Sequence, residues 1–368
     1  MNRLGLIAVL LFLGCEDSSE SIHREYLVDS TSLKYGGTIG EDIENLCLAG
    51  VTDAFFVDSN SIVVIEYVRG LVSTVDLNSM TVSQIGRQGP GPDEYTRPIH
   101  GCLLGCNMVA ISDVRGQILF YRDTTFISSI TETGVFYPLN IKAFADSCLV
   151  GRIMELKSDD EGLIAVTKVV VFEDEHIKSI WSDGGKIIDF SSANDFLGMA
   201  FLNASFCEGP NKTVFVAQRT PDTYLVTQYN LNGEEVGRIE QEVALVEKEK
   251  ASKEEEVIVM ESLSRIAELE GVPICWEPEP YWDQIIEIGI GPDRNLWIRK
   301  GTTNSLAYDV YSTQGEYQHT LIFDERDHTK FWVTHINSFG IVAYDLHPDR
   351  SDIVHLIRYD SNEAQSNI

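Results

Sequence analysis

The sequence predicts an all-β fold, a six-bladed β-propeller, and three observations lead to this prediction. Six segments repeat one pattern of strand, turn and second strand, and these strands are rich in β-branched and aromatic residues. Most copies recur at the spacing of a four-stranded propeller blade. A strand-like stretch near the N-terminus belongs to no copy, so it is available to close a ring.

The net charge and the hydrophobic content limit the kinds of partner that this protein can bind. The 368 residues contain 28 Lys and Arg against 57 Asp and Glu, a formal net charge of −29. Nucleic acid is not an expected partner, because phosphate binding needs a surplus of cations, and a basic membrane patch is excluded for the same reason. A hydrophobic content of 43% is ample for a large core. We expect a monomer that binds a protein, a small molecule or a glycan.

The first residues indicate export. Leu4 to Gly14 form an apolar run that is too short to span a bilayer and has the length of a signal-peptide core. Gly14-Cys15 at its end, followed by a polar stretch, resembles a bacterial lipobox. We expect residues 1–14 to be a lipoprotein signal peptide, Cys15 to carry the lipid, and residues 15–25 to be a tether. The alternative is an ordinary signal peptide with a chance cysteine.

This N-terminus predicts a location in the cell envelope, at the outer membrane or the periplasmic face, with the lipid anchor as the only membrane contact. Six cysteines follow Cys15, and an oxidising compartment allows up to three disulfides among them. Small buried thiols are the other interpretation. The six are Cys47, Cys102, Cys106, Cys148, Cys207 and Cys275.

The repeat can be followed along the chain by one anchor residue per copy. The anchors are Ile62, Met108, Cys148, Val214, Leu296 and Ile341. Their intervals are 46, 40, 66, 82 and 45 residues, and three of these match a blade of 40–50 residues. We expect an acidic loop at residues 157–161 to lengthen the third copy.

The interval of 82 residues contains a helical insertion. Val259, Leu263 and Ile266 recur at helical spacing among Glu and Lys, and Gly271 and Pro273 end the pattern. We expect the helix near residues 241–272, within an insertion of about 241–280. Its many glutamates are typical of a solvated helix face.

The last copy ends near Tyr359 and leaves no room for an outer strand. Residues 26–35 have strand composition and can supply that strand by pairing with residues 340–360. Closure of this kind removes exposed sheet edges. The expected organisation is one propeller over residues 26–362 with a tail at 363–368. A seven-bladed ring or a pair of β-sandwiches is the alternative.

One loop carries a family resemblance. Residues 84–95, Gln-Ile-Gly-Arg-Gln-Gly-Pro-Gly-Pro-Asp-Glu-Tyr, closely resemble the "IGrxGxGPGEF" loop of bacterial six-bladed β-propeller lipoproteins, which are relatives of NHL-repeat and TolB-like propellers. Asp93 and Tyr95 stand where that family usually has Gly and Phe. The aromatic stretch from Trp276 to Trp297 also looks like this family. The resemblance implies a scaffold more than a reaction.

The same loop is the first candidate site. A loop between two blades lies on the ligand-bearing face of a propeller, and Arg87 could accept an anion there, beside Asp93, Glu94 and Tyr95. The alternative is that the glycines and prolines only build the crossover, while Arg87 pairs with Asp93 or Glu94. We favour this structural alternative.

The first residues of the innermost strands form the second candidate site, because in a propeller they converge at the mouth of the channel. The residues are Asp53, His100, Asn140, Asn203, Asp283 and His335. Their oxygen and nitrogen atoms could hold a divalent metal, and propeller lactonases use a calcium site of this general kind. A polar, hydrated channel is the favoured interpretation. We therefore expect no metal or cofactor, with Ca²⁺ as the alternative.

Five aromatic residues gather around the insertion in sequence: Trp276, Tyr281, Trp282, Trp297 and Trp332. They could stack on a sugar or contact a hydrophobic partner. We favour a packing role, in which Trp276 and Tyr281 dock the insertion onto the ring while Trp297 and Trp332 belong to the strand core.

No motif of a catalytic class occurs in the chain. There is no His-Glu-x-x-His, Gly-x-Ser-x-Gly, P-loop or Gly-x-Gly-x-x-Gly sequence. No catalytic residue can be assigned. The sequence therefore favours a binding or interaction module. The alternative is a metal-dependent, lactonase-like hydrolase or lyase at the channel mouth.

Overall fold

The computed structural model describes residues 33–39, 48, 50–105, 107–131, 136–144, 148–159, 162–173, 176–187, 204–266, 276–303, 305–323, 331–349 and 353–359. The predicted signal peptide, Cys15 and the tether lie outside these residues. No helix in the described ranges is long and apolar enough to cross a membrane.

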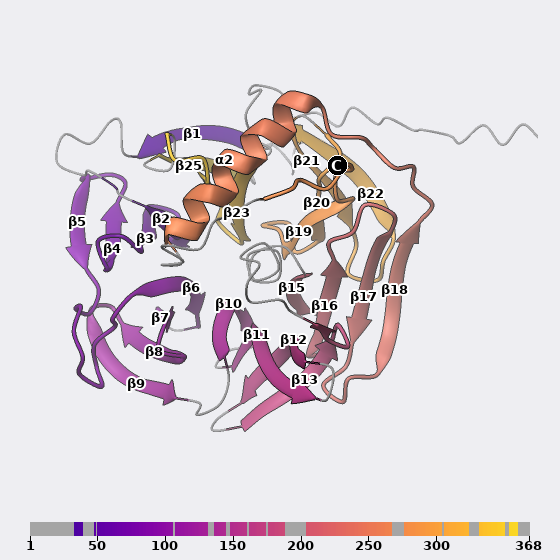
Figure 1. Cartoon of the computed structure of the whole chain (residues 1–368). Coiled ribbons are helices and arrows are strands. Elements are labelled where there is room, and N and C mark those ends of the chain that lie inside the picture. The colour runs from indigo at the N-terminus through magenta and orange to yellow at the C-terminus, as the bar shows by residue number, and fades with distance from the viewer. Residues whose placement is uncertain are drawn as a thin grey trace, which may run out of the picture.

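Six antiparallel sheets follow one another along the chain and form the ring of a six-bladed β-propeller (Figure 1). Blade 1 contains β2 (Val51–Asp58), β3 (Ser61–Glu66), β4 (Leu71–Asp76) and β5 (Thr81–Gln84). Blade 2 contains β6 (Pro98–Leu104), β7 (Met108–Asp113), β8 (Gln117–Arg122) and β9 (Thr125–Thr131). Blade 3 contains β10 (Phe136–Phe144), β11 (Cys148–Asp159), β12 (Gly162–Glu173), β13 (His176–Ser182) and the short β14 (Lys186–Ile187).

The second half of the ring repeats this arrangement. Blade 4 contains β15 (Ala204–Gly209), β16 (Thr213–Gln218), β17 (Tyr224–Tyr229) and β18 (Glu235–Gln241). Blade 5 contains β19 (Ile285–Ile290), β20 (Leu296–Lys300), β21 (Leu306–Tyr311) and β22 (Tyr317–Phe323). Blade 6 contains β23 (Trp332–Asn337), β24 (Gly340–Asp345), β25 (Val354–Tyr359) and β1 (Leu33–Ile39).

Strand β1 closes the ring, as the sequence predicts. It pairs with β25 from Leu33 opposite Tyr359 to Ile39 opposite Val354. Ile39 is buried in the core shared by blades 6 and 1. The strand runs four residues past the predicted end at Tyr35, and residues 26–32 lie outside the described ranges.

The hydrophobic core lies between blades. Six clusters of buried side chains occur in the described residues, and each joins two neighbouring blades around the ring. This follows from the strand patterns, because the inner strands are buried on both faces. β24 is buried throughout, whereas the outer strand β5 is fully exposed.

One local prediction needs correction. The expected acidic loop at residues 157–161 is largely strand, because β11 and β12 pair without interruption to Asp159 opposite Gly162. The helix α2 spans Lys250–Ile266 and lies within the helical insertion predicted near residues 241–272. Among the described residues, Cys102, Cys148 and Cys207 are free thiols.

The insertion is anchored by one buried ion pair. Lys248 Nζ lies 2.6 Å from Glu256 Oε2 on α2, and the other carboxylate oxygen accepts a 3.0 Å hydrogen bond from Trp276 Nε1. Lys248 also lies over the Trp282 ring, 5.1 Å from its centre. Val259 is buried on the same side of the helix. Trp276 and Trp282 therefore hold the insertion in place.

All six inner strands begin on one face of the ring, which we call the mouth face. The second strand of each blade ends there, as the pairs Val51–Glu66, Pro98–Asp113 and Trp332–Asp345 show. Because outer strands lead into inner strands at this face, residues 85–97 and the helical insertion belong to it as well.

Candidate functional site

Four inner strands are irregular at the same place, close to the mouth face. The pairing with the second strand shifts directly before Asp53, His100, Asn140 and Glu287. A β-bulge of this kind changes the direction of the side chain that follows it. In all four blades that side chain is polar, so the bulges place a set of polar groups near the start of the channel.

Three of the predicted residues meet in what we call the histidine cluster: Asp53, His100 and His335. His100 Nδ1 lies 3.5 Å from Asp53 Oδ2, and His335 Nδ1 lies 3.6 Å from Asp53 Oδ1. The backbone N–H of Gly101 donates a 2.9 Å hydrogen bond to Oδ2. One carboxylate thus joins blades 6, 1 and 2.

The surroundings keep Asp53 ionised. Burial alone would raise the pKa of this carboxyl group, because the charged form loses its water. The hydrogen bonds and positive charge of His100 and His335 outweigh burial and hold the pKa well below its usual value. Asp53 is therefore a fixed negative charge between two imidazoles.

The opposite side of the channel contains what we call the lysine bridge: Lys142, Glu287 and Thr334. Lys142 of blade 3 donates a 2.9 Å hydrogen bond to the carbonyl oxygen of Ile288 in blade 5, and its Nζ lies 3.6 Å from Glu287 Oε1. Thr334 of blade 6 donates a hydrogen bond to Glu287 Oε2. The lysine therefore connects blades 3 and 5, which are not neighbours in the ring.

Three successive blades carry an arginine in or directly after the second strand, and we call Arg152, Arg219 and Arg299 the arginine arc. Arg152 stands opposite Asn140, Arg299 stands opposite Glu287, and Arg219 directly follows β16. Arg152 donates to the carbonyl oxygen of Ala204, the first residue of β15.

Arg299 makes the equivalent contact with the carbonyl oxygen of Trp332, the first residue of β23. Arg219 Nε lies 3.4 Å from Asp283 Oδ2. Burial, together with the charge of Arg219, lowers the pKa of Arg152 to about 10. Burial also lowers the pKa of Arg299, to which Arg219 again contributes. Arg219 therefore lies close enough to repel both Arg152 and Arg299.

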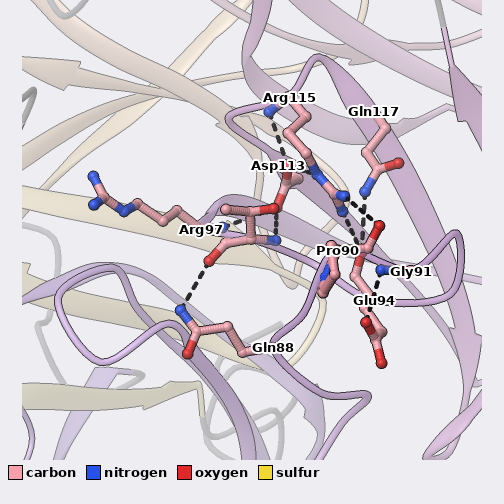
Figure 2. Close-up of polar contacts among 9 residues, drawn as sticks. Gln88, Pro90, Gly91, Glu94, Arg97, Asp113, Arg115 and Gln117 are labelled. Atoms are coloured by element: carbon pink, nitrogen blue, oxygen red, sulfur yellow. Dashed lines mark hydrogen bonds and ion pairs between the residues drawn. The ribbon is translucent and has the colours of Figure 1, made fainter.

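The other three blades carry buried acids at the mouth ends of their second strands: Asp345, Glu66 and Asp113. Figure 2 shows one of them, Asp113. Its Oδ2 accepts hydrogen bonds from the backbone N–H groups of Thr96 and Arg97, and its Oδ1 accepts from the N–H and Nε of Arg115. Charge is thus divided around the mouth, with acids on blades 6, 1 and 2 and cations on blades 3, 4 and 5.

The predicted ligand loop is tied down from within, as Figure 2 also shows. Arg115 and Gln117 donate to the carbonyl oxygen of Glu94, and the Glu94 carboxylate accepts a 2.7 Å hydrogen bond from the Gly91 N–H. A side chain at Gly89 would collide with this carboxylate, which explains the glycine.

Arg87 and Tyr95 take structural positions in this loop. Arg87 Nε lies 2.6 Å from Glu94 Oε1, and Asp93 is a more distant partner at 3.9 Å. Tyr95 is fully buried, and its hydroxyl donates to the carbonyl oxygen of Ile85 at 3.0 Å. A ligand-binding role for these residues stays a prediction.

The remaining predicted residues lie elsewhere. Asp283 pairs with Arg219 and stands apart from the histidine cluster, since the bulged position of blade 5 is occupied by Glu287, four residues later. Asn203 lies outside the described residues. Trp297 is buried, and Trp332 stacks on His355 with ring centres 4.1 Å apart.

Sequence reasoning missed the lysine bridge and the arginine arc. A signal for the arc was present, because the second strands of three successive copies contain or run into an arginine, while those of the other three end in Asp or Glu. Among the described residues, no three His, Cys, Asp or Glu side chains are arranged to hold a metal ion together.

Several solved structures are similar to this chain at low sequence identity. No family model and no curated protein matches the chain. An aldose sugar dehydrogenase from Streptomyces coelicolor, solved with PQQ, is 11% identical with a TM-score of 0.47, over 89% of this chain and 98% of that one. A candidate exported protein from Bacteroides fragilis is 12% identical with a TM-score of 0.43, over 92% of this chain and 98% of that one.

A streptogramin B lyase is 10% identical with a TM-score of 0.44, over 89% of this chain and 97% of the lyase. These likenesses carry no activity over to this chain.

Proposed function

We propose that this protein is an exported, lipid-anchored binding module that holds a small anionic ligand at the mouth of its channel. The arginine arc carries the proposal. In a chain with a net charge of −29, three of its cations lie in or directly after the second strands of three adjacent blades. A local cationic site in an acidic protein concentrates anions that the rest of the surface repels.

The chemistry of the arc indicates the kind of ligand. Guanidinium groups bind carboxylates and phosphates through two parallel hydrogen bonds, which a compact ammonium group cannot do. Arg219 is the accessible member, with 18% of its side chain exposed.

Binding can be tested by thermal shift at constant ionic strength, with citrate and inorganic phosphate as anionic probes and glucose as the neutral probe. We expect an anionic probe to raise the melting temperature and Arg219→Gln to abolish that rise. Arg238→Gln, on the exposed outer strand β18, is the matched control. Equal responses of the two variants, or a response to glucose alone, would contradict anion binding.

The anchor has a separate test. Cys15→Ser should prevent lipid attachment and move the protein out of the membrane fraction, or leave it unprocessed. Mass spectrometry of the mature chain and fractionation measure both effects. Membrane partitioning and mature mass that stay the same in this variant would contradict the lipoprotein assignment.

A further inference from the structure

Strand β1 enters the ring from the face opposite the mouth face, which we call the far face. β24 ends at the mouth, and its end pairs with the start of β25, Tyr344 opposite Val354. β25 therefore runs away from the mouth and ends on the far face at Tyr359. Leu33, the first residue of β1, pairs with Tyr359. The part of the chain that precedes β1 thus joins the propeller on the far face.

The two faces are built from different kinds of connection. The far face carries short turns within blades, such as residues 77–80 between β4 and β5 and residues 312–316 between β21 and β22. The mouth face carries the longer connections between blades, among them residues 85–97 and the helical insertion. The candidate site and the predicted attachment of the lipid therefore lie on opposite faces.

The arginine arc is set back from the surface of the mouth face. Arg152 and Arg299 are buried, and Arg219 exposes only 18% of its side chain. A small dissolved anion can enter such a site from any side. A lipid headgroup remains part of a broad bilayer surface, which the longer connections of this face keep at a distance. The burial of the arc therefore favours a dissolved ligand.

We propose that the lipid anchor holds the mouth face away from the membrane, so that the arginine arc takes a water-soluble carboxylate or phosphate from the aqueous phase and no lipid headgroup. This inference rests on the proposed function, since it needs both the anchor at Cys15 and anion binding by the arc. It adds the orientation of the anchored protein and the source of its ligand.

The length of the connection supports this orientation. Seventeen residues, 16–32, lie between Cys15 and Leu33 in the sequence. A flexible chain of this length has a root-mean-square span of about 23 Å. The seven residues of β1 alone extend over about 23 Å from the far face toward the mouth. The mouth can face the membrane only if the connection runs back along the whole blade, which costs chain entropy.

Free tumbling on the tether is the competing explanation. In that case both faces meet the bilayer equally often, and a headgroup has the same access to the mouth as a dissolved anion. Two measurements separate the explanations: which face lies nearer the bilayer, and whether lipid competes for the arc.

The first measurement compares the two ends of β4. Residues 1–15 are replaced by a hexahistidine tag, and the protein is bound to vesicles with nickel-chelating lipid, so the result does not depend on lipidation of Cys15. A fluorophore is attached at Val68→Cys, exposed in the mouth-face turn before β4, or at Asn78→Cys, exposed in the far-face turn after it. The unsubstituted protein measures labelling of the native cysteines.

Energy transfer to an acceptor lipid should be stronger from position 78 than from position 68, because the six residues of β4 separate the two labels by about 20 Å. Equal transfer from both positions would show free tumbling. Stronger transfer from position 68 would show that the mouth faces the bilayer. Either of these two results overturns the proposal.

The second measurement identifies the source of the anion. Binding of citrate and of inorganic phosphate is compared on phosphatidylcholine vesicles and on vesicles that also contain phosphatidylglycerol. We expect equal affinities, because the mouth then lies further from the bilayer than the screening length of about 8 Å at physiological salt. Weaker binding on the anionic vesicles would show that headgroups act on the arc, and it would overturn the proposal.

A failure of the proposed function gives a different pattern. Without anion binding by the arc, the free protein responds to neither probe, and without lipidation the Cys15→Ser variant fractionates like the parent. Both results are obtained without vesicles, and each overturns this inference together with the function. A mouth that faces the bilayer, in a protein that binds anions and carries the lipid, overturns this inference alone.

Discussion

The two halves of the channel mouth have the same backbone and opposite chemistry. On blades 6, 1 and 2 the second strands end in buried acids, whereas on blades 3, 4 and 5 arginines lie in or directly after the second strand. The strand ladders separate the two sets by one residue, because Glu66 and Asp113 pair with the residues before the bulges, while Arg152 and Arg299 pair with the residues after them. The difference teaches that the repeat decides where a side chain stands, while departures from the repeat decide what the site can bind.

The halves also differ in how their charges are satisfied. Glu66 pairs with Arg69 and Asp113 pairs with Arg115, three and two residues away in sequence. The cations instead reach other blades, as Arg152, Arg299 and Lys142 do. The acids are therefore neutralised locally, and the cations depend on the intact ring.

Opening the ring should cause the largest loss of stability, because both halves of the mouth depend on the closed ring. Deletion of residues 16–39 removes all of β1, with its ladder to β25 and the burial of Ile39. We expect a loss of about 5 kcal/mol of unfolding free energy, from buried apolar area and lost hydrogen bonds together. Denaturant unfolding measures it, and deletion of residues 16–25 is the control. Equal midpoints for the two deletions would contradict closure by β1.

Removing one cation from each half tests the difference between local and distant pairing. Lys142→Met leaves Glu287 without its cation inside the channel and should cost about 3 kcal/mol. Arg115→Met should cost only about 1 kcal/mol, since Asp113 keeps three backbone N–H donors. Chemical unfolding of the two variants and of the parent protein measures both losses of stability.

A second substitution confirms the origin of the Lys142 effect. Glu287→Gln in the Lys142→Met background removes the stranded charge and keeps an acceptor for Thr334, so most of the stability should return. A double variant no more stable than Lys142→Met would show that the ion pair is not the cause.

A smaller effect is expected in the loop of the acidic half. Tyr95→Phe removes a buried hydroxyl that donates to the Ile85 carbonyl oxygen and accepts from the Val72 N–H. The expected cost is about 1.5 kcal/mol. Hydrogen exchange should show faster opening of residues 85–97, with blades 3 to 5 unchanged. Uniformly faster exchange around the ring would argue against a local role.

The smallest effect belongs to Arg87→Ala. Its side chain is 69% exposed, and an exposed ion pair such as the one with Glu94 contributes at most about 1 kcal/mol. We therefore expect a nearly unchanged melting temperature and, if the ligand sits at the arginine arc, unchanged anion binding. Loss of binding in this variant would move the site to the loop.

The sequence was a good guide to blades and a partial guide to the site. The period-2 pattern located all six blades, and the first residues of the inner strands identified Asp53, His100 and His335 correctly as neighbours. It pointed to Asp283 in place of Glu287, because the start of β19 and its bulge between Ile285 and Glu287 leave no mark on the alternation.

What the sequence alone determined is the part of this protein that is encoded locally. Strand alternation, turn residues and repeat length act over a few residues, so they predict a propeller, its closing strand and its helical insertion. The tertiary structure alone decided which side chains meet across the channel. Lys142 and Ile288 stand 146 residues apart, and their contact depends on ring closure and on single-residue bulges. A shift of one residue in the pairing register turns a side chain to the opposite face of the sheet, so no local sequence pattern can specify such a contact.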